Sequence, residues 1–298
     1  MLGLGNNIFK SSTAEGSLVS NRVSFIGLLN ETYGADAEAA YSVRKLSSSA
    51  TVAMTIRRES DNEELAIGFV DGNINEAAIE AHCTGTTCRV VQWNDQSGND
   101  NHATQDSEGA QPTIYTGGAL VKENGKVAVD FDGSSDNYLF FVGAIGISGA
   151  DPRTYIAVLN PDVNANETVI QHGDNNVAQN MQHFILTTEL GNRYYGSNNL
   201  FATSNTSQML VFNPLIGDSA HDTEMYLDGT QLSYTSRGPD STLNTADSYL
   251  SIGISNVGTL VNEYNGNMQE IIIYGSDKSG TDQTSIESNI NTFYNIYS

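Results

Sequence analysis

Short apolar segments separated by turns make up the second half of the chain, and this pattern limits the fold more than any other feature. The segment "KVAVDFDG" (126–133) alternates, with Val127, Val129 and Phe131 on one face. Similar segments follow as "RTYIAVLN", "ETVIQHG", "HFILTTE", "QMLVFN", "EMYLDGTQL", "YLSIGIS" and "NMQEIIIYGS". Alternation with a period of two predicts half-buried strands, and regular spacing of such strands is typical of an antiparallel β-sandwich.

Helices are expected to be few and short. An Ala-rich segment at 34–48 predicts one helix, and a second is predicted from about Asn75, after a turn at Asp71-Gly72. The chain ends with "TDQTSIESNINTFYNIY", in which apolar residues recur at helical spacing behind a Ser or Thr cap. We therefore predict an all-β sandwich with short helices and a C-terminal helix.

The charge of the chain excludes two classes of partner. The formal net charge is −22, from 13 basic and 35 acidic residues. Such a chain repels nucleic-acid phosphates and anionic lipid, so we expect no nucleic acid partner. No segment approaches the ~20 apolar residues of a membrane span, so we expect no membrane insertion.

The two cysteines, Cys83 and Cys88, lie in "HCTGTTCR". The intervening residues, which include Gly85, can close a small disulfide loop if the two Cα atoms come within reach. A zinc site would need more ligands, and only His82 is near. A disulfide indicates an oxidising compartment, yet the N-terminus does not show a signal-peptide pattern.

Residues 1–30 differ from the remainder, because apolar residues are scattered there without a clear period. Exposed Leu2, Leu4, Ile8 and Phe9 would be wasteful without a partner. Two interpretations stay open: a frayed terminus, or an arm that anchors the chain to other subunits. Residues 31–298 contain neither a linker nor an internal repeat, so we predict one sandwich domain behind this arm.

Two resemblances sharpen the fold prediction. The last fifty residues, with "EMYLDGTQL", "YLSIGIS" and "YNGNMQEIIIYGSD" before the closing helix, resemble the end of a laminin G-like, concanavalin A-like jelly roll. Residues 40–105, with "AYSVRKLSSS", "TIRRESDNEELAIGF" and "HCTGTTCRVVQWNDQSGNDNHATQ", resemble the catalytic domain of arabinofuranosidase B-type glycoside hydrolases. The two matching cysteines of that family are bonded, which implies a Cys83–Cys88 bridge here.

The hydrolase resemblance also implies positions for the catalytic groups. A retaining glycosidase needs two carboxyl groups ~5 Å apart. In "NMQHFIL" (180–186), Gln182 stands at the position of the family's nucleophilic Glu. In "SIGISNVG" (251–258), Asn256 or Val257 stands at the position of the acid/base Asp. Thr168 and Val169 replace the adjacent half-cystines with which the family grips its sugar.

These replacements predict a protein that is not an enzyme. A sandwich of this kind with an N-terminal arm resembles bacteriophage virion structural proteins. The predicted function is therefore a non-catalytic, homo-oligomeric capsid, neck or tail component, located in the virion and attached to other virion proteins by its arm. Its sandwich would face solvent and contact host glycans, with Trp93, Asp95, His102 and Gln182 as candidate sugar-binding residues.

Other interpretations stay open. One is a secreted arabinofuranosidase-like hydrolase with Glu189 or Asp174 as substitute carboxylates, and another is a free carbohydrate-binding module. Trp93 is more often a core residue in such a strand, and Asp95 begins a turn whose side chains can bond the backbone. No cofactor is expected except calcium, for which Asp130, Asp132 and Asp136 are candidate ligands.

Overall fold

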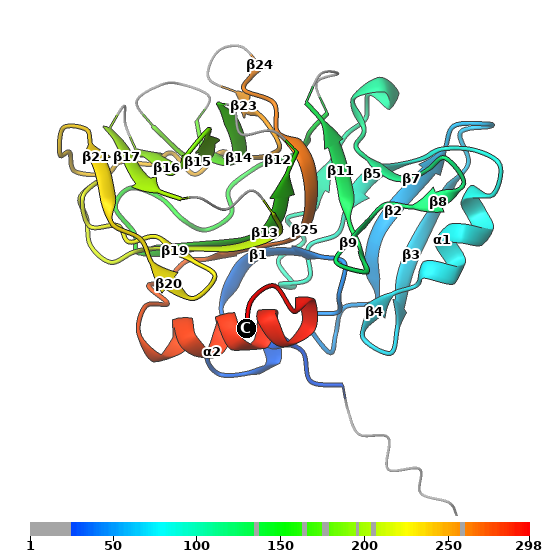
Figure 1. Ribbon diagram of the computed structural model, residues 1–298, viewed down its shortest axis with the longest axis horizontal. Coiled ribbons are helices and arrows are strands. Elements are labelled where there is room, and N and C mark those ends of the chain that lie inside the picture. Colours follow the sequence, from blue (N-terminus) through cyan, green and yellow to red (C-terminus); the bar gives the residue numbers. More distant parts are fainter. Residues whose placement is uncertain are drawn as a thin grey trace, which may run out of the picture.

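The structure, a computed structural model, describes residues 25–133, 137–162, 166–174, 179–194, 197–203, 207–256 and 260–298. Its strands form two stacked antiparallel layers, which Figure 1 shows with β13 and β25 in one layer and β14 to β17 in the other. The predicted concanavalin A-like β-sandwich with a C-terminal helix is confirmed. We call the layers the β25 layer and the β15 layer after their central strands.

The β25 layer is built around a long apolar strand. It contains β1 (Ala37–Ser42), β11 (Val129–Asp132), β25 (Asn265–Tyr274), β13 (Arg153–Pro161), β18 (Met209–Leu215), β19 (Tyr226–Leu227) and β20 (Thr230–Gln231). β25 pairs with β13 along one edge, and with β1 and β11 along the other. Ile271, Ile272 and Ile273 are all fully buried, because both faces of the strand are covered. Each such side chain contributes roughly 1.5–3 kcal/mol by leaving water.

The β15 layer faces this core from the other side. In pairing order it contains β12 (Leu139–Val142), β22 (Tyr249–Ile252), β14 (Glu167–Gly173), β15 (Asn180–Leu186), β16 (Glu189–Tyr194), β17 (Ser197–Ala202) and β21 (Tyr234–Arg237). A small hairpin, β23 (Ser255–Asn256) with β24 (Leu260–Val261), follows β22. Residues of β15 alternate between the interior and the outward face, as a strand requires.

The N-terminal third forms a separate group of strands beside the sandwich (Figure 1). It contains β2 (Val52–Arg58), β3 (Glu64–Val70), β4 (Asn73–Ile74), α1 (Glu76–Cys83), β5 (Cys88–Trp93), β6 (Ala103–Thr104), β7 (Thr113–Thr116), β8 (Ala119–Leu120), β9 (Lys122–Glu123) and β10 (Lys126–Val127), with the 3-10 turns η1 (Leu28–Asn30) and η2 (Glu108–Ala110). β6 pairs with β12 and β7 with β11, so this group is hydrogen-bonded to both layers.

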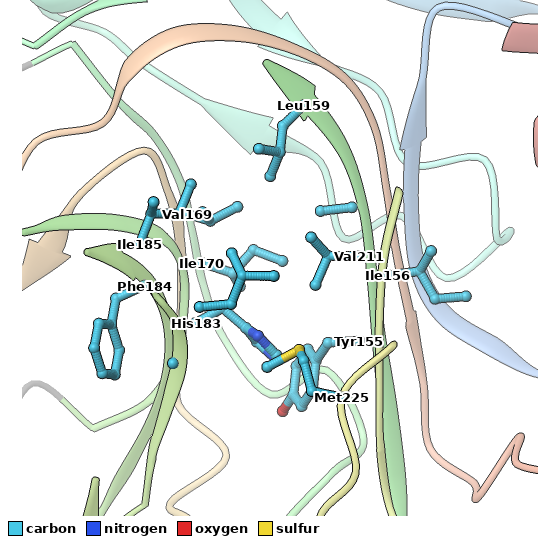
Figure 2. Close-up of a pocket in the computed structure, with 13 residues that line it drawn as sticks. Tyr155, Ile156, Leu159, Val169, Ile170, His183, Phe184, Ile185, Val211 and Met225 are labelled. Carbon is cyan, nitrogen blue, oxygen red and sulfur yellow. The ribbon is translucent and has the colours of Figure 1, made fainter. Parts of the chain in front are cut away.

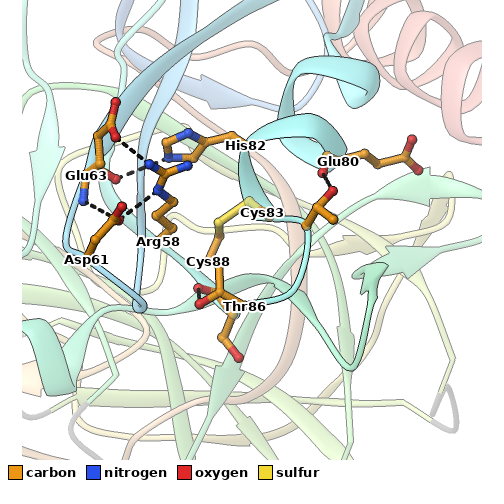
Figure 3. The surroundings of a disulfide bond; sticks show 10 residues. Arg58, Asp61, Glu63, Glu80, His82, Cys83, Thr86 and Cys88 are labelled. Atoms are coloured by element: carbon orange, nitrogen blue, oxygen red, sulfur yellow. Dashed lines mark hydrogen bonds and ion pairs between the residues drawn. A yellow bond between two sulfur atoms is a disulfide. The ribbon is translucent and has the colours of Figure 1, made fainter.

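The predicted disulfide is confirmed. Cys83 ends α1 and Cys88 begins β5, with a Cα–Cα distance of 5.8 Å and both residues fully buried. Gly85 adopts φ 80° in the turn between them, a conformation that glycine reaches without strain. Figure 3 shows the charged surroundings, in which Arg58 pairs with Asp61 and Glu63.

The helix predicted at 34–48 is wrong. Residues Ala37–Ser42 form β1, which pairs with β25. Ala39, Ala40 and Tyr41 are fully buried against the isoleucines of the neighbouring strand. Tertiary pairing therefore overrides the helix propensity of the Ala-rich segment.

The C-terminal helix α2 (Thr281–Tyr294) packs on the outer face of the β25 layer (Figure 1). Its N-cap is Gly280 and not the predicted Thr281 or Ser279. A fully buried carboxylate, Glu270 of β25, accepts two bonds from Arg44, from Nε at 2.7 Å and from Nη2 at 2.8 Å, and one from the Tyr294 hydroxyl at 3.1 Å. None of the described helices is both long and apolar enough to cross a membrane.

Candidate active site

The outward face of the β15 layer carries a transverse row of polar side chains. Residues directly opposite each other in an antiparallel pair project from the same face. The strand register therefore aligns, in this order, Ser251, Gln171, Gln182, Arg193 and Asn198. We call these five residues the polar row.

The opposite face of the same strands points into the interior. Figure 2 shows His183 of β15 directed toward Tyr155 and Met225, inside a cavity between the two layers. Because successive side chains of a strand alternate, Gln182 lies on the outward face. The cavity holds only about 20 Å³, too small for a sugar, and its lining is almost entirely apolar. Burial lowers the pKa of His183 to about 3, so this imidazole is neutral.

A network of amides holds the polar row together. Gln182 Nε2 donates to Gln171 Oε1 at 3.1 Å and to Ser255 Oγ at 2.8 Å, and its Oε1 accepts from Arg193 Nη1 at 2.9 Å. Gln171 also exchanges bonds with the backbone of Asn256, accepting from N at 2.9 Å and donating to O at 3.2 Å. β23 is thereby fixed over the sheet. The resemblance placed carboxylates at Gln182 and at Asn256 or Val257. The structure brings Gln182 close to Asn256, and both are amides, whereas Val257 lies outside the described residues.

Three aromatic residues lie at one end of the polar row. Phe140 stands opposite Ser251, and its ring stacks on Tyr249 with centroids 6.2 Å apart. The centroid of the Tyr138 ring lies 5.8 Å from that of Phe140. All three rings are partly exposed. We call them the aromatic stack; flat, partly exposed rings beside amides are the groups that bind the apolar face and the hydroxyls of a sugar.

Two carboxyl groups, those of Asp247 and Glu38, lie close to Gly146. Asp247 Oδ2 accepts from the Gly146 backbone N at 2.7 Å. Glu38 Oε2 lies only 2.8 Å from the point that a Cβ of Gly146 would occupy. Both carboxyl groups therefore contact one residue, although Glu38 comes from β1 and Asp247 from the segment before β22. We call them the carboxylate pair.

The two members of the carboxylate pair have opposite pKa shifts. Burial raises the pKa of Glu38, and the negative charges of Asp247, Asp36 and Asp95 raise it further. Burial also acts to raise the pKa of Asp247, but hydrogen bonds from His172 and from two backbone amides outweigh it and lower the pKa. One carboxyl group is thus favoured as the acid and the other as the anion, the division of roles that acid–base catalysis requires.

A buried chain of hydrogen bonds supports Asp247. His172 Nε2 lies 3.3 Å from Asp247 Oδ1, and His172 Nδ1 lies 2.9 Å from the Tyr155 hydroxyl. Burial lowers the pKa of His172, so the imidazole is neutral and the contact is a hydrogen bond and not an ion pair. A neutral ring that donates to the carboxylate from Nε2 accepts a hydrogen bond from the tyrosine hydroxyl at Nδ1.

The sequence-predicted sugar contacts in the N-terminal group serve the scaffold. Trp93 is fully buried and packs against Tyr41. Asp95 is buried and accepts from the backbone N of Ala40 at 2.8 Å and of Asn101 at 3.1 Å. His102 Nδ1 accepts from the Asp95 backbone N at 3.1 Å. Of the four predicted sugar contacts, only Gln182 belongs to the polar row.

The remaining predicted site residues lie partly outside the described residues. Asp130 and Asp132 lie on β11, and burial raises the pKa of Asp130 to about 6, while Asp136 lies outside the described residues. Across the described part of the chain, no group of three His, Cys, Asp or Glu side chains is placed to hold a metal ion. The anchor residues Leu2, Leu4, Ile8 and Phe9 also lie outside the described residues, so the anchor and the homo-oligomer stay predictions.

The two substitute carboxylates of the hydrolase interpretation lie far apart in the strand register. Glu189 begins β16 at the turn after β15, and its carboxylate accepts from the Thr235 hydroxyl. Asp174 follows β14, near the opposite end of the same strands. Their positions do not suit a catalytic pair, for which the carboxyl groups must lie within about 5–10 Å of each other.

Sequence reasoning missed Glu38, Asp247 and Arg193. Glu38 fell in a predicted helix, and the segment "TADSYL" around Asp247 has no motif. Arg193 is separated from Gln182 by eleven positions, and only the β15–β16 register places them side by side. Correct strand pairing would have identified Arg193, whereas no local signal identifies the carboxylate pair.

Comparison with known proteins points to a carbohydrate-active family. Residues 30–150, less than half of the chain, match the sequence model of the family described as "Alpha-L-arabinofuranosidase B, catalytic". A search of curated proteins finds no match.

Solved structures with a similar fold include three arabinofuranosidase structures. One is an arabinofuranosidase complexed with arabinofuranosyl-α-1,2-xylobiose, at 20% identity and a TM-score of 0.63. Another is a Glu-to-Gln variant of a GH54 α-L-arabinofuranosidase soaked with 4-nitrophenyl α-L-arabinofuranoside, at 20% identity and a TM-score of 0.65. A GH54 enzyme soaked with a cyclic sulfate inhibitor matches at 19% identity and a TM-score of 0.65. In each comparison the match covers 85% of this chain and 62% of the other, so the chain corresponds to less than two thirds of these proteins.

The prediction of a non-catalytic virion protein is wrong. The match of residues 30–150 to an arabinofuranosidase B catalytic-domain model overturns it and favours the hydrolase interpretation, and the arabinofuranosidase structures share the fold. The prediction failed because it inferred inactivity from single positions such as Gln182. Two carboxyl groups that lie far apart in the sequence can come together in the fold, as those of Glu38 and Asp247 do.

Proposed function

We propose that this chain is a glycoside hydrolase of the arabinofuranosidase B type, which cleaves terminal arabinofuranosyl groups from glycans. The observation that carries the proposal is the match of residues 30–150 to the catalytic-domain family. The partly exposed aromatic stack and the polar row support a carbohydrate ligand. The carboxylate pair supports acid–base chemistry, and Glu38 and Gly146 lie within the matched segment.

In this proposal Glu38 is the general acid. Burial and the nearby carboxylates raise its pKa, which favours the protonated form that donates a proton to the glycosidic oxygen as the bond to the anomeric carbon breaks. The ionised carboxylate of Asp247 faces the positive charge that develops on the sugar. Water then adds its hydroxyl to the anomeric carbon, and its remaining proton returns to a carboxylate.

The environment of Asp247 suits the anionic role. Backbone amides of Ile145 and Gly146 each donate to it at 2.7 Å, and neutral His172 supplies a third donor. Donors that are fixed before the reaction stabilise charge without reorganisation, which is a large source of rate enhancement. Gln182 cannot act as a nucleophile, and its buried amide is assigned to holding Arg193 in place.

The test is release of 4-nitrophenol from an aryl α-L-arabinofuranoside by the full chain and by two isosteric variants, Glu38→Gln and Asp247→Asn. Each variant should reduce kcat by roughly 10²–10⁴-fold, the usual contribution of a positioned acid or base. Glu189→Gln is the matched control, because this carboxylate contacts a surface threonine, and it should retain activity.

Three outcomes contradict the proposal. Absence of hydrolysis by the unmodified chain on arabinofuranosides removes the proposed activity. Full activity of both variants removes the carboxylate pair from the mechanism. Loss of activity in a folded Glu189→Gln variant would show that Glu189, and not the carboxylate pair, is the catalytic carboxylate.

A further inference from the structure

Arg193 differs from the other members of the polar row because it is positively charged and its hydrogen-bond partners are neutral. Its Nε donates to Asn198 Oδ1 at 2.6 Å and its Nη1 to Gln182 Oε1 at 2.9 Å. The guanidinium also lies over the Phe184 ring, 5.2 Å from the centroid. These contacts hold the plane of the guanidinium while leaving Nη2 and one N–H of Nη1 without a described partner, and the residue is partly exposed.

Among the described residues, no carboxylate pairs with Arg193. Burial lowers the pKa of its guanidinium, and no acidic neighbour offsets that effect. The only acidic residues outside the described ranges are Glu15 and Asp136. In a chain with 35 acidic residues and 13 basic ones, a half-buried cation beside two amides is costly unless a ligand supplies the anion.

We infer that Arg193 binds the carboxylate of an acidic sugar, that is, a uronate unit of a glycan. A guanidinium with two free N–H groups along one edge fits a carboxylate in a bidentate arrangement. Gln182 is buried and holds the guanidinium in place, whereas the partly exposed amide of Asn198 can bond a sugar hydroxyl. The aromatic stack at the far end of the row can contact further sugar units.

The charge of the chain favours a monoanionic ligand over a polyanion. A net charge of −22 repels densely charged molecules at long range, whereas one carboxylate on a neutral sugar ring meets mainly the local field of Arg193. Gln182 matters here because it is an amide: a carboxylate at this position would pair with Arg193 and occupy the site.

This inference goes beyond the proposed function and does not depend on hydrolysis. Binding of methyl glucuronide and of methyl glucoside, its neutral counterpart, is measured by titration calorimetry with the full chain. Neither ligand carries an arabinofuranosyl group, so turnover does not enter the measurement. Inorganic phosphate is the third ligand and separates a sugar site from a general anion site.

We expect the uronate to bind at least tenfold more tightly than its neutral counterpart and more tightly than phosphate. Arg193→Gln should weaken uronate binding by roughly ten- to hundredfold and leave the neutral sugar unchanged, because a charge-assisted hydrogen bond is lost. Gln182→Glu should weaken it similarly, since the new carboxylate pairs with the guanidinium internally. Arg193→Lys keeps the charge without the planar fork and should have an intermediate effect.

The thermal midpoint of each variant is recorded beside the affinities, and Arg193→Lys provides the comparison if Arg193→Gln does not fold. Equal affinity for the uronate and the neutral sugar overturns the inference. So does unchanged uronate affinity in Gln182→Glu, or phosphate binding as tight as the uronate. Loss of arabinofuranosidase activity without loss of uronate selectivity would contradict only the proposed function.

Discussion

The polar row and the carboxylate pair are two polar regions of one sandwich, yet they have opposite electrostatics. The polar row combines neutral amides with one cation, and its members are neighbours on adjacent strands. The carboxylate pair combines two acids that come from β1 and from the segment before β22, and both contact Gly146. Fixed amides and an unpaired guanidinium suit binding, whereas two carboxyl groups with opposite pKa shifts suit proton transfer.

This contrast explains why an amide at position 182 does not decide whether the chain is an enzyme. Gln182 belongs to the region that suits binding, where a carboxylate would neutralise Arg193. The acids lie where a glycine admits them side by side. Any Cβ at position 146 would contact the Glu38 carboxylate, and the residue has φ 97°, which disfavours other side chains.

The largest expected effect is a loss of kcat on substitution in the carboxylate pair but not in the polar row. Glu38→Gln should lower kcat by roughly 10²–10⁴-fold, while Gln182→Ala should mainly raise KM, since the first removes a proton donor and the second the side chain that holds Arg193 in place. Steady-state kinetics on an aryl arabinofuranoside measure both constants. Comparable losses of kcat in the two variants would erase the distinction.

The pH dependence of activity should follow the carboxylate pair alone. Activity requires protonated Glu38 and ionised Asp247, so it falls by about tenfold per pH unit above the raised pKa of Glu38 and below the lowered pKa of Asp247. Arg193→Gln should leave both limbs in place. A limb that moves in this variant would show that the regions are coupled.

The same shifts affect stability in opposite senses. A lowered pKa in the folded state means that Asp247 stabilises the fold above its unfolded pKa and that this contribution is lost as the pH falls through its folded value. Glu38, whose pKa is raised, stabilises the fold when protonated and loses this contribution as the pH rises. Asp247→Asn should therefore make unfolding by urea less sensitive to acid, and an unchanged acid sensitivity would contradict this assignment.

Removing Gln171, which supports the polar row, is expected to have a smaller effect, and this effect is on stability. Gln171→Ala removes both bonds to the Asn256 backbone and one of the bonds of the Gln182 amide, which should cost about 1–3 kcal/mol of unfolding free energy. Chemical denaturation measures the loss. Asn198→Ala, which removes a partly exposed contact of Arg193, is the comparison and should cost less.

The smallest effect is expected at the aromatic stack. Tyr249→Leu keeps apolar area but removes the ring that stacks on Phe140, a change of roughly 0.5–1.5 kcal/mol in contact energy. Glycan affinity should fall about two- to tenfold, with kcat unchanged, in the same calorimetric and kinetic assays. A hundredfold loss would place Tyr249 among the reacting groups.

Several features were readable from residues alone because their causes are local. Alternating segments predicted most strands of both layers, and Asp228-Gly229 predicted the hairpin between β19 and β20. The spacing of Cys83 and Cys88 allowed a bridge, and the resemblance to the hydrolase family implied it. Only β1 was misread as a helix, because its Ala-rich pattern fits a helix until β25 pairs with it.

The sequence by itself therefore determined the fold class and the strongly acidic composition, which depend on local periodicity and residue content, and the disulfide was implied by resemblance. Only the tertiary structure decided which polar residues meet. The β15–β16 register placed Arg193 beside Gln182, and the closure of β1 against the segment before β22 placed Glu38 beside Asp247. The physical reason is that strand register and packing between layers are long-range properties, whereas a linear pattern reports only the neighbours along the chain.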